Sequence, residues 1–430
     1  MTSFDPGLAG LIPELRWRGM FHAASDGLEA RLGSGRPITG YNGFDPSGPW
    51  LHIGHLIPIF GLLHLQRHGG RPVVVIGGGT GMIGDPSGRS SERVLQARDQ
   101  IEANVAAMRP QFERLLDFSG PRGTLIVNNL DWLEPIALLD WLRDVGKHFT
   151  IPYMLAKDSV QLRLERGLSF TEFSYMLIQA TDYEHLHRTM GVELQMGGAD
   201  QFGNITAGLE LIRRSAAGDD RQAPDAFALA YPLLLAPSGA KFGKSEGGDS
   251  VWLHPDGTTP YAFYQHWLNT DDRDVPVYLR WFTTMSVQEI EDLEGDLVAR
   301  PEARAAQRAL ALDVTARVHG EATARAVADA SVELFEPGSI ADPDRLAKLY
   351  GLVGGFTVSA PPDAPAATAL AEAGVVGSRG EVRRLIAGGG LTVNGERLAD
   401  PNGPLPAAIG GQWYEVRIGK RKREIGRRTS

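Results

Sequence analysis

The segment Pro72-Val-Val-Val-Ile76 is an unbroken apolar run, and Gly77-Gly-Gly-Thr-Gly81 follows it at once. A short apolar run without polar alternation predicts a strand buried on both faces, as in a parallel sheet. Outward from this run, strand-like and helix-like segments alternate, which predicts an α/β fold with helices on both faces of an open parallel sheet. The expected strands are 38–44, 124–127, 193–196 and 227–235, and the expected helices are 53–67, 92–118, 135–147, 171–190 and 199–214.

The second half of the chain has no regular alternation of strand-like and helix-like segments. Helices are expected at 258–269, 275–282, 286–297 and 301–334, and the proline-rich stretch 359–365 predicts a linker. Beyond it, two short helices (366–372 and 379–387) precede Asn394-Gly395, a dipeptide typical of a two-residue hairpin turn. The sequence therefore predicts four parts: a parallel-sheet domain over 1–247, an all-α domain over 248–345, a linker over 346–365 and a small α+β domain over 366–430.

Composition excludes several kinds of chemistry. The 430 residues are 43% hydrophobic and 22% charged, and they include no cysteine. A disulfide framework, a cysteine zinc site and a thiol nucleophile are therefore excluded, and a reducing cytoplasm is the expected location. The first residues do not resemble a secretion signal, and the most apolar window, 72–84, is too short to span a bilayer.

Charge is distributed unevenly along the chain. The net charge is −9, yet residues 376–430 hold 11 basic and 5 acidic side chains, so this end is +6 and the rest is −15. Such asymmetry predicts an interaction tail. Only seven of the 43 basic residues are lysine, so a pair of neighbouring lysines needs an explanation.

A dinucleotide-binding pattern is present but misplaced. Gly79-Thr-Gly81-Met-Ile-Gly84 matches GxGxxG after a strand, a pattern that requires a helix beginning at the glycines. The turn-forming run Asp85-Pro-Ser-Gly88 breaks such a helix. We expect these glycines instead to let a ligand approach the carboxyl end of the strand.

Two histidines stand where a helix should begin. In Trp50-Leu-His52-Ile-Gly54-His55 the imidazoles are three residues apart on the first turn, where unpaired backbone N–H groups favour phosphate. Gly54 leaves room for a flat ligand. The alternatives are a metal pair, for which no third ligand stands at a recognisable spacing, and an ordinary helix N-terminus.

A lysine pair occurs in the segment Lys241-Phe-Gly-Lys244-Ser245. Two of the seven lysines lie here between glycines, and lysine can follow a polyphosphate as charge moves to the leaving group. The segment is no P-loop, and a solvated surface loop is the alternative.

Together, the HIGH and KFGKS segments resemble the signature pair of the class I aminoacyl-tRNA synthetases. The resemblance is closest to the bacterial tyrosyl-tRNA synthetases and covers essentially the whole chain in order. It is carried by YNGFDPSGPWLHIGHL, IGDPSGRSSER, DVGKHFTIPYMLAKDSVQ, SFTEFSYMLIQA, QMGGADQFGNITAGLELIRR and KFGKS.

This resemblance implies a two-step reaction and an architecture. L-tyrosine and ATP would give tyrosyl-adenylate and pyrophosphate, and tyrosyl would pass to the 3′-terminal adenosine of tRNA(Tyr). It also implies Mg²⁺ accompanying ATP without a protein metal site, a cytoplasmic homodimer, a Rossmann-like catalytic domain, an anticodon-side helical domain and a C-terminal S-four-type RNA-binding domain. The alternatives are a tryptophanyl-tRNA synthetase and an inactive synthetase-like RNA-binding protein.

The resemblance assigns the tyrosine ligands. Tyr41 and Asp182 would hold the phenol hydroxyl, and leaving such buried groups without their partner is costly, so phenylalanine would be rejected. Tyr175 and Gln179, four residues apart on one helix face, match ligands of the amino group, although an aromatic residue at helical spacing also suits core packing. Asp85 and Gln201 match further contacts.

Nucleotide ligands follow from the same resemblance. Those expected near ATP are Gly43, Asp45, Ser47, His52, Gly54, His55, Asp200 and Lys244. Those expected to meet pyrophosphate as it leaves are Arg89, Arg93, Lys241 and Lys244, with Ser245 completing the signature. The class consensus KMSKS reads KFGKS here, and Arg89 stands where many relatives have lysine.

The basic C-terminal part is expected to bind tRNA phosphates. A solubilising tail is the alternative. The candidate residues are Arg379, Arg383 and Arg384 on a helix, followed by Arg417, Lys420, Arg421, Lys422 and Arg423.

Overall fold

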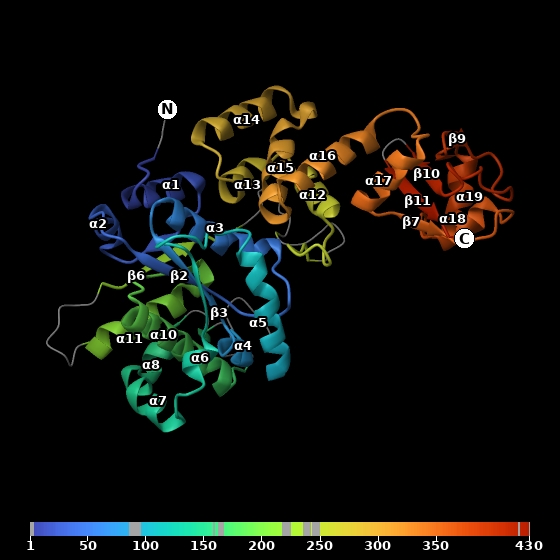
Figure 1. Ribbon diagram of the computed structural model, residues 1–430. Helices are drawn as coiled ribbons and strands as arrows, with labels where there is room; N and C mark the ends of the chain where they lie inside the picture. The colour runs from blue at the N-terminus through green and yellow to red at the C-terminus, as the bar shows by residue number, and fades with distance from the viewer. Residues whose placement is uncertain are drawn as a thin grey trace. The chain divides into compact units, whose positions relative to one another are not determined.

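The computed structural model describes residues 4–85, 96–157, 160–161, 167–216, 225–234, 242, 250–419 and 422–429 (Figure 1). The chain divides into two compact units. The first comprises 1–257 and 270–310, and the second comprises 258–269 and 311–430.

The first unit is built on a six-stranded sheet. The strand order is β1-β6-β5-β2-β3-β4; the short edge strand β1 is antiparallel to β6 and the other pairs are parallel. This confirms the predicted parallel-sheet fold. The strands are β1 (Ala23–Ala24), β2 (Thr39–Phe44), β3 (Arg71–Ile76), β4 (Leu125–Asn128), β5 (Leu194–Gly198) and β6 (Phe227–Tyr231).

Helices cover both faces of this sheet. On β2, Asn42 hydrogen bonds to a carbonyl of α3, whereas Tyr41, pointing the other way, packs with Tyr183 of α10. The helices of the unit are α1 (Leu11–Arg18), α2 (Leu28–Gly33), α3 (Leu56–Arg67), α4 (Thr80–Ile83), α5 (Arg98–Phe112), α6 (Leu130–Leu133), α7 (Leu138–Asp144), α8 (Ile151–Leu155), α10 (Phe170–Met190), α11 (Phe202–Ala216), α13 (Val275–Phe282) and α14 (Val287–Ala299). The short 3-10 turns are η1 (Leu8–Gly10), η2 (Ile53–His55), η3 (Gly146–His148), η4 (Ala199–Gln201) and η5 (Pro301–Ala303).

Three predicted helices differ in length or continuity. The segment 92–118 is helical over α5, and residues 92–95 lie outside the described part. The predicted helix 135–147 is shorter than expected, because α7 ends at Asp144 and the 3-10 turn η3 follows it. The predicted helix 301–334 is interrupted at Gly320, whose φ of 90° ends α15 (Ala305–His319) before α16 (Glu321–Phe335) begins.

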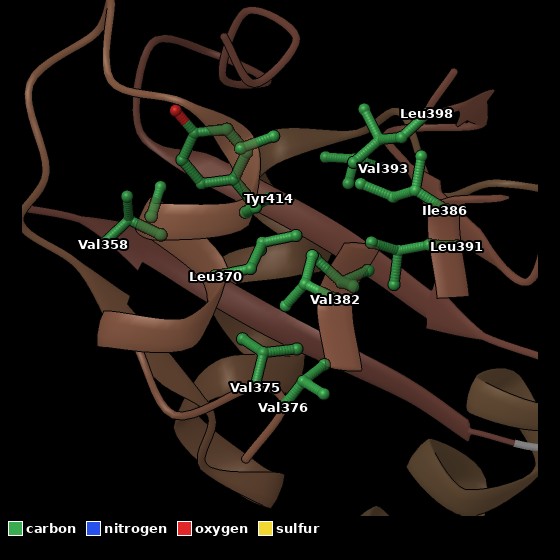
Figure 2. Packing of buried hydrophobic residues seen from close by; sticks show 14 of the residues in the cluster. Val358, Leu370, Val375, Val376, Val382, Ile386, Leu391, Val393, Leu398 and Tyr414 are labelled. Carbon is green, nitrogen blue, oxygen red and sulfur yellow. The ribbon is translucent and has the colours of Figure 1, made fainter. Parts of the chain in front are cut away.

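The second unit contains a five-stranded sheet, ordered β7-β11-β10-β8-β9. The predicted hairpin is confirmed: β8 and β9 are joined by Asn394 and Gly395, both at positive φ. The strands of this sheet share an apolar core with the helices α18 and α19 (Figure 2). The elements are α12 (Pro260–Leu268), α16, α17 (Pro343–Val353), β7 (Phe356–Val358), α18 (Ala366–Glu372), α19 (Arg379–Ala387), β8 (Leu391–Val393), β9 (Glu396–Arg397), β10 (Trp413–Ile418) and β11 (Lys422–Arg428).

The predicted linker over 346–365 is wrong for much of its length. Residues up to Val353 belong to α17, and β7 is a strand that pairs in parallel with β11. Apolar side chains decide this, because Leu346 and Leu349 of α17 are buried with Trp413 and Ile425. The proline-rich composition describes only the residues after β7.

Candidate active site

A cavity of about 410 Å³ opens in the first unit, at the point where the chain reverses the order in which it adds strands to the sheet. The chain runs from β2 outward to β3 and β4, then returns to β5 on the other side of β2. Ligands of open α/β sheets bind at such a switch point, outside the carboxyl ends of the strands. The cavity is lined there by the ends of β2, β3 and β5 and by residues of η2 and α10.

The two histidines of the HIGH segment lie together at one wall. Their ring centroids are 3.9 Å apart, and η2 begins between them. His52 Nδ1 accepts a hydrogen bond from the Gly54 N–H, and His55 Nδ1 accepts one from the His52 N–H, each 3.0 Å long. Burial and the neighbouring His52 lower the pKa of His55 to about 3, so His55 is neutral at pH 7. With Nδ1 accepting, its proton is on Nε2, which makes His55 a donor to a ligand oxygen.

Gly54 leaves room for the ring of His52. A Cβ at this position would stand 2.7 Å from Cε1 of His52. The expected space for a flat ligand is therefore partly used by the His52 ring, although both residues line the cavity.

Asp182 of α10 lies in the cavity wall with 3% of its surface exposed. Its carboxylate accepts hydrogen bonds from Asn129 Nδ2 at 2.9 Å and Trp132 Nε1 at 2.8 Å. Burial raises the pKa of Asp182 to about 7, against these two hydrogen bonds, which lower it. The site thus holds an acceptor that is poorly hydrated and fixed in direction.

The hydroxyl of Tyr41 is buried in the same wall. Among the described residues no group forms a hydrogen bond with it. Burial, then the charge of Asp182, raises the pKa of Tyr41 well above its usual value, so the hydroxyl keeps its proton. A buried hydroxyl without a partner is costly unless a ligand supplies one.

A chain of side-chain amides crosses the cavity from β5 to η4. Gln195 donates to Gln179 at 3.3 Å, Gln179 to Gln201 at 3.4 Å, and Gln201 to Asp85 at 2.7 Å. Tyr175, four residues before Gln179, is buried and also lines the cavity. The predicted tyrosine ligands are therefore brought together around one cavity.

The predicted nucleotide side is brought to the same cavity. Gly43 and Ser47 line it, and Asp45 accepts a hydrogen bond from Thr80 at 3.1 Å. Asp200 also lines it, and burial and Asp85 raise its pKa. The residues predicted to meet pyrophosphate lie outside the described residues, as does Ser245 of the signature; they are Arg89, Arg93, Lys241 and Lys244.

On the second unit, α19 is the exposed basic element. Arg383 and Arg384 are exposed, and Arg379 is exposed although it pairs with Glu372 at 2.6 Å. Lys422 is exposed and pairs with Glu424 at 2.6 Å. Lys420 and Arg421 lie outside the described residues.

The prediction of a basic tail is wrong. Residues 413–418 and 422–428 instead form the strands β10 and β11 of the second sheet. Arg423 is only 4% exposed and pairs with the buried Glu415 at 2.9 Å, so its guanidinium does not face a phosphate. Arg417 is 28% exposed and is held by the same carboxylate at 3.2 Å. These two arginines are therefore removed from the predicted RNA contacts.

Sequence reasoning missed Asn129 and Trp132, which hold Asp182. Their position offered a signal, since Asn128 ends β4 and Asn129 follows it directly, and polar residues at the carboxyl end of a parallel strand lie at the ligand edge. It also missed Gln195, which lies in β5 and reads as an interruption of an apolar run.

Comparison with known proteins gives matches over nearly the whole chain. A family model described as tRNA synthetases class I (W and Y) matches residues 34–336, and an S4 domain model matches residues 367–406. A protein of Anaeromyxobacter dehalogenans named Tyrosine--tRNA ligase is 49% identical over 420 residues, which is 96% of this chain and 98% of the relative. One of Geobacillus stearothermophilus with the same name is 46% identical over 419 residues, 96% and 98% of the two chains. A solved structure of a C-terminally truncated Aspergillus nidulans mitochondrial tyrosyl-tRNA synthetase matches with a TM-score of 0.68 at 28% identity, covering 76% of this chain and 94% of that one.

Proposed function

The chain belongs to the class I tRNA synthetases of the W and Y family, and on that premise we propose that it is a ligase that charges tRNA(Tyr) with tyrosine. It would first form tyrosyl-adenylate and pyrophosphate from L-tyrosine and ATP. It would then transfer tyrosyl to the 3′-terminal adenosine of the tRNA. The resemblance predicted from the HIGH and KFGKS segments is confirmed at the level of the family.

The observation that carries the choice of tyrosine is that Tyr41 and Asp182 are both buried in the lining of the same cavity. A phenol hydroxyl can donate to the Asp182 carboxylate and accept from the Tyr41 hydroxyl, which has no other partner among the described residues. Phenylalanine would leave the Tyr41 hydroxyl without a partner and would offer no donor to the remaining lone pairs of Asp182. An indole N–H could donate but could not accept, which disfavours the tryptophan alternative.

The first step needs positioning more than proton transfer. The tyrosine carboxylate attacks the α-phosphorus of ATP, an oxygen–phosphorus bond forms, and the bond to the bridging oxygen breaks as pyrophosphate leaves. The carboxylate is already ionised at pH 7, so no general base is required. His52 and His55 would donate N–H groups to phosphate oxygens, and such preorganised donors stabilise the charge that develops.

Mg²⁺ is proposed to arrive with ATP and to neutralise phosphate charge while bound through phosphate oxygens. Among the residues that the structure describes, no three His, Asp or Glu side chains lie close enough together to hold a metal ion. The second step breaks the anhydride of the adenylate: the terminal ribose hydroxyl attacks the tyrosyl carbonyl and AMP leaves.

Pyrophosphate exchange into ATP tests the activation step. We expect exchange with tyrosine to exceed exchange with phenylalanine or tryptophan, each measured on the same preparation. Faster exchange with tryptophan would establish the tryptophanyl alternative. A lack of exchange with all three would establish the alternative of an inactive RNA-binding protein.

A homodimer is proposed from an apolar surface on the first unit. Leu138, Leu139 and Leu142 of α7 are 68%, 78% and 46% exposed, and Ile151 of α8 is 58% exposed. Several exposed large apolar side chains on two successive helices are typical of an interface. Leu139→Glu should yield monomers in analytical ultracentrifugation, whereas Val298→Glu, at an 86% exposed position on α14, should not. Equal sedimentation of both variants would place the interface elsewhere.

The cytoplasm is the proposed location. Within the described part of the chain, no helix combines the length and the apolar character that crossing a membrane requires. The proposal rests on the absence of cysteine from the whole sequence, because a chain without disulfides fits a reducing compartment.

A further inference from the structure

The C-terminal sheet carries a buried charged cluster on one face. Glu415 of β10 is 1% exposed, and its carboxylate pairs with Arg423 Nε at 2.9 Å and Arg417 Nε at 3.2 Å. It also accepts hydrogen bonds from Ser339 Oγ and, at 3.2 Å, from the Ile340 N–H. We call Glu415, Arg417 and Arg423 the clasp.

The clasp holds the end of helix α16. Arg423 donates to the Glu333 carbonyl at 3.1 Å, to the Glu336 carbonyl at 2.7 Å and to the Gly338 carbonyl at 2.6 Å. Arg417 donates to the Glu336 carbonyl at 3.0 Å and to the Gly338 carbonyl. The last turn of α16 contains no basic residue of its own. Since the carboxyl end of a helix favours a cation, the sheet supplies the cap that α16 lacks.

The opposite face of the same strand supports the RNA-binding helix. Side chains alternate along β10, so Tyr414 and Val416 point away from the clasp. They pack in the core that holds Val382 and Ile386 of α19, as Figure 2 shows for Tyr414, Val382 and Ile386. A displacement of β10 against α16 would therefore displace α19 as well.

From this arrangement we propose that the clasp fixes the direction in which α19 is presented relative to α16, and that Glu415, Arg417 and Arg423 are positioning residues for tRNA charging. The proposal rests on the proposed function, because it takes α19 as the element that meets tRNA. It predicts that the charging step depends on a carboxylate that touches no substrate, whereas adenylate formation, which occurs in the first unit, does not depend on it.

Glu415→Gln separates positioning from simple electrostatics. Removing a negative charge from the RNA-binding unit should strengthen phosphate binding if charge alone mattered. If the clasp positions α19, the KM for tRNA should instead rise about tenfold, the effect of losing one charge-assisted hydrogen bond. The kcat of tyrosine-dependent pyrophosphate exchange should stay within about twofold. The matched control is Glu424→Gln, which makes the same charge change at a partly exposed pair on the neighbouring strand.

Distance measurement tests the geometry directly. Because the chain has no cysteine, Ala322→Cys on α16 and Ala387→Cys on α19 allow two spin labels at exposed positions of the full-length protein. We expect a narrow distance distribution in the otherwise unchanged chain and in Glu424→Gln, and a broad one in Glu415→Gln. Arg423→Lys keeps the charge but loses the planar fork that reaches several carbonyls, so it should also broaden the distribution.

Two results would overturn the proposal. One is a distribution that stays narrow in both Glu415→Gln and Arg423→Lys. The other is a broad distribution with a KM for tRNA no higher than that of Glu424→Gln. Failure of the parent chain to charge tRNA with tyrosine would instead refute the proposed function, while the label distances would still decide whether the clasp fixes α19.

Discussion

Asp182→Asn should make the stability of the first unit less dependent on pH. The pKa of Asp182 is about 7 in the folded chain against 3.8 for an unperturbed carboxyl. Below about pH 4 the Asp182 carboxyl is protonated in both the folded and the unfolded chain, so it does not change the free energy of unfolding. As pH rises toward 7 the unfolded state releases its proton first, so the folded state loses stability. At about 1.4 kcal/mol per pKa unit, the loss between pH 5 and pH 8 is about 3 kcal/mol.

The variant removes this titration at a cost that does not depend on pH. An amide has one acceptor oxygen, so it satisfies Asn129 or Trp132 but not both, and the unpaired donor costs about 1–3 kcal/mol. Asp182→Asn should therefore stabilise the fold at pH 8 and leave it unchanged or weakened at pH 5. The preference for tyrosine over phenylalanine in exchange should fall at least tenfold, by roughly the 1.4 kcal/mol that corresponds to that factor.

Urea unfolding followed by tryptophan fluorescence at pH 5 and pH 8 measures the effect. The control is Asp131→Asn, at an exposed position on the neighbouring helix α6, which should follow the parent protein at both pH values. If Asp182→Asn also shows the parent's difference between pH 5 and pH 8, Asp182 is not the titrating group and the electrostatic account of this wall is wrong.

Three further changes have defined outcomes. His55→Ala should lower the kcat of pyrophosphate exchange about 100-fold, and a retained rate would show that His55 does not bind phosphate. In the parent protein, exchange should show no titration of His55 between pH 5 and pH 9, because the pKa of His55 is about 3. Glu14→Gln should cost about 3 kcal/mol in urea unfolding, since its buried carboxylate pairs with Arg18 and His68, each at 2.7 Å; a loss as small as that of an exposed ion pair would contradict this. Arg383→Met should weaken tRNA binding and reduce the salt slope by about one ion, and an unchanged slope would exclude a phosphate contact.

Local pattern sufficed where one physical preference dominated. The apolar run at 72–76 became a strand buried on both faces, and Asn394-Gly395 became a hairpin because both residues adopt positive φ. The placement of His52 and His55 side by side at the start of a helical turn followed from helix geometry alone. In each case the deciding interactions lie within a few residues of one another along the chain.

Prediction failed where distant partners decide. The stretch 413–428 reads as a basic tail because its charges outnumber its apolar residues, yet in the folded sheet Arg417 and Arg423 both pair with Glu415. That pairing also depends on carbonyls of residues 333–338, about 80 positions earlier. Asn129 and Trp132 escaped notice for the same reason, because Asp182, their acceptor, lies some 50 residues away.

The charges that line the cavity determine what an ATP site there would require. Its described lining includes Asp45, Asp85, Asp182 and Asp200 and no lysine or arginine. Such a wall suits the ammonium group of an amino acid, but it repels the phosphates of ATP. Neutral histidine donors at the helix start do not offset the negative charge of this wall. Cations must therefore come with the nucleotide, as Mg²⁺, or from segments beyond the described lining. The family resemblance assigns this role to Lys241 and Lys244, which lie outside the described residues, so we expect their replacement to weaken ATP binding more than tyrosine binding.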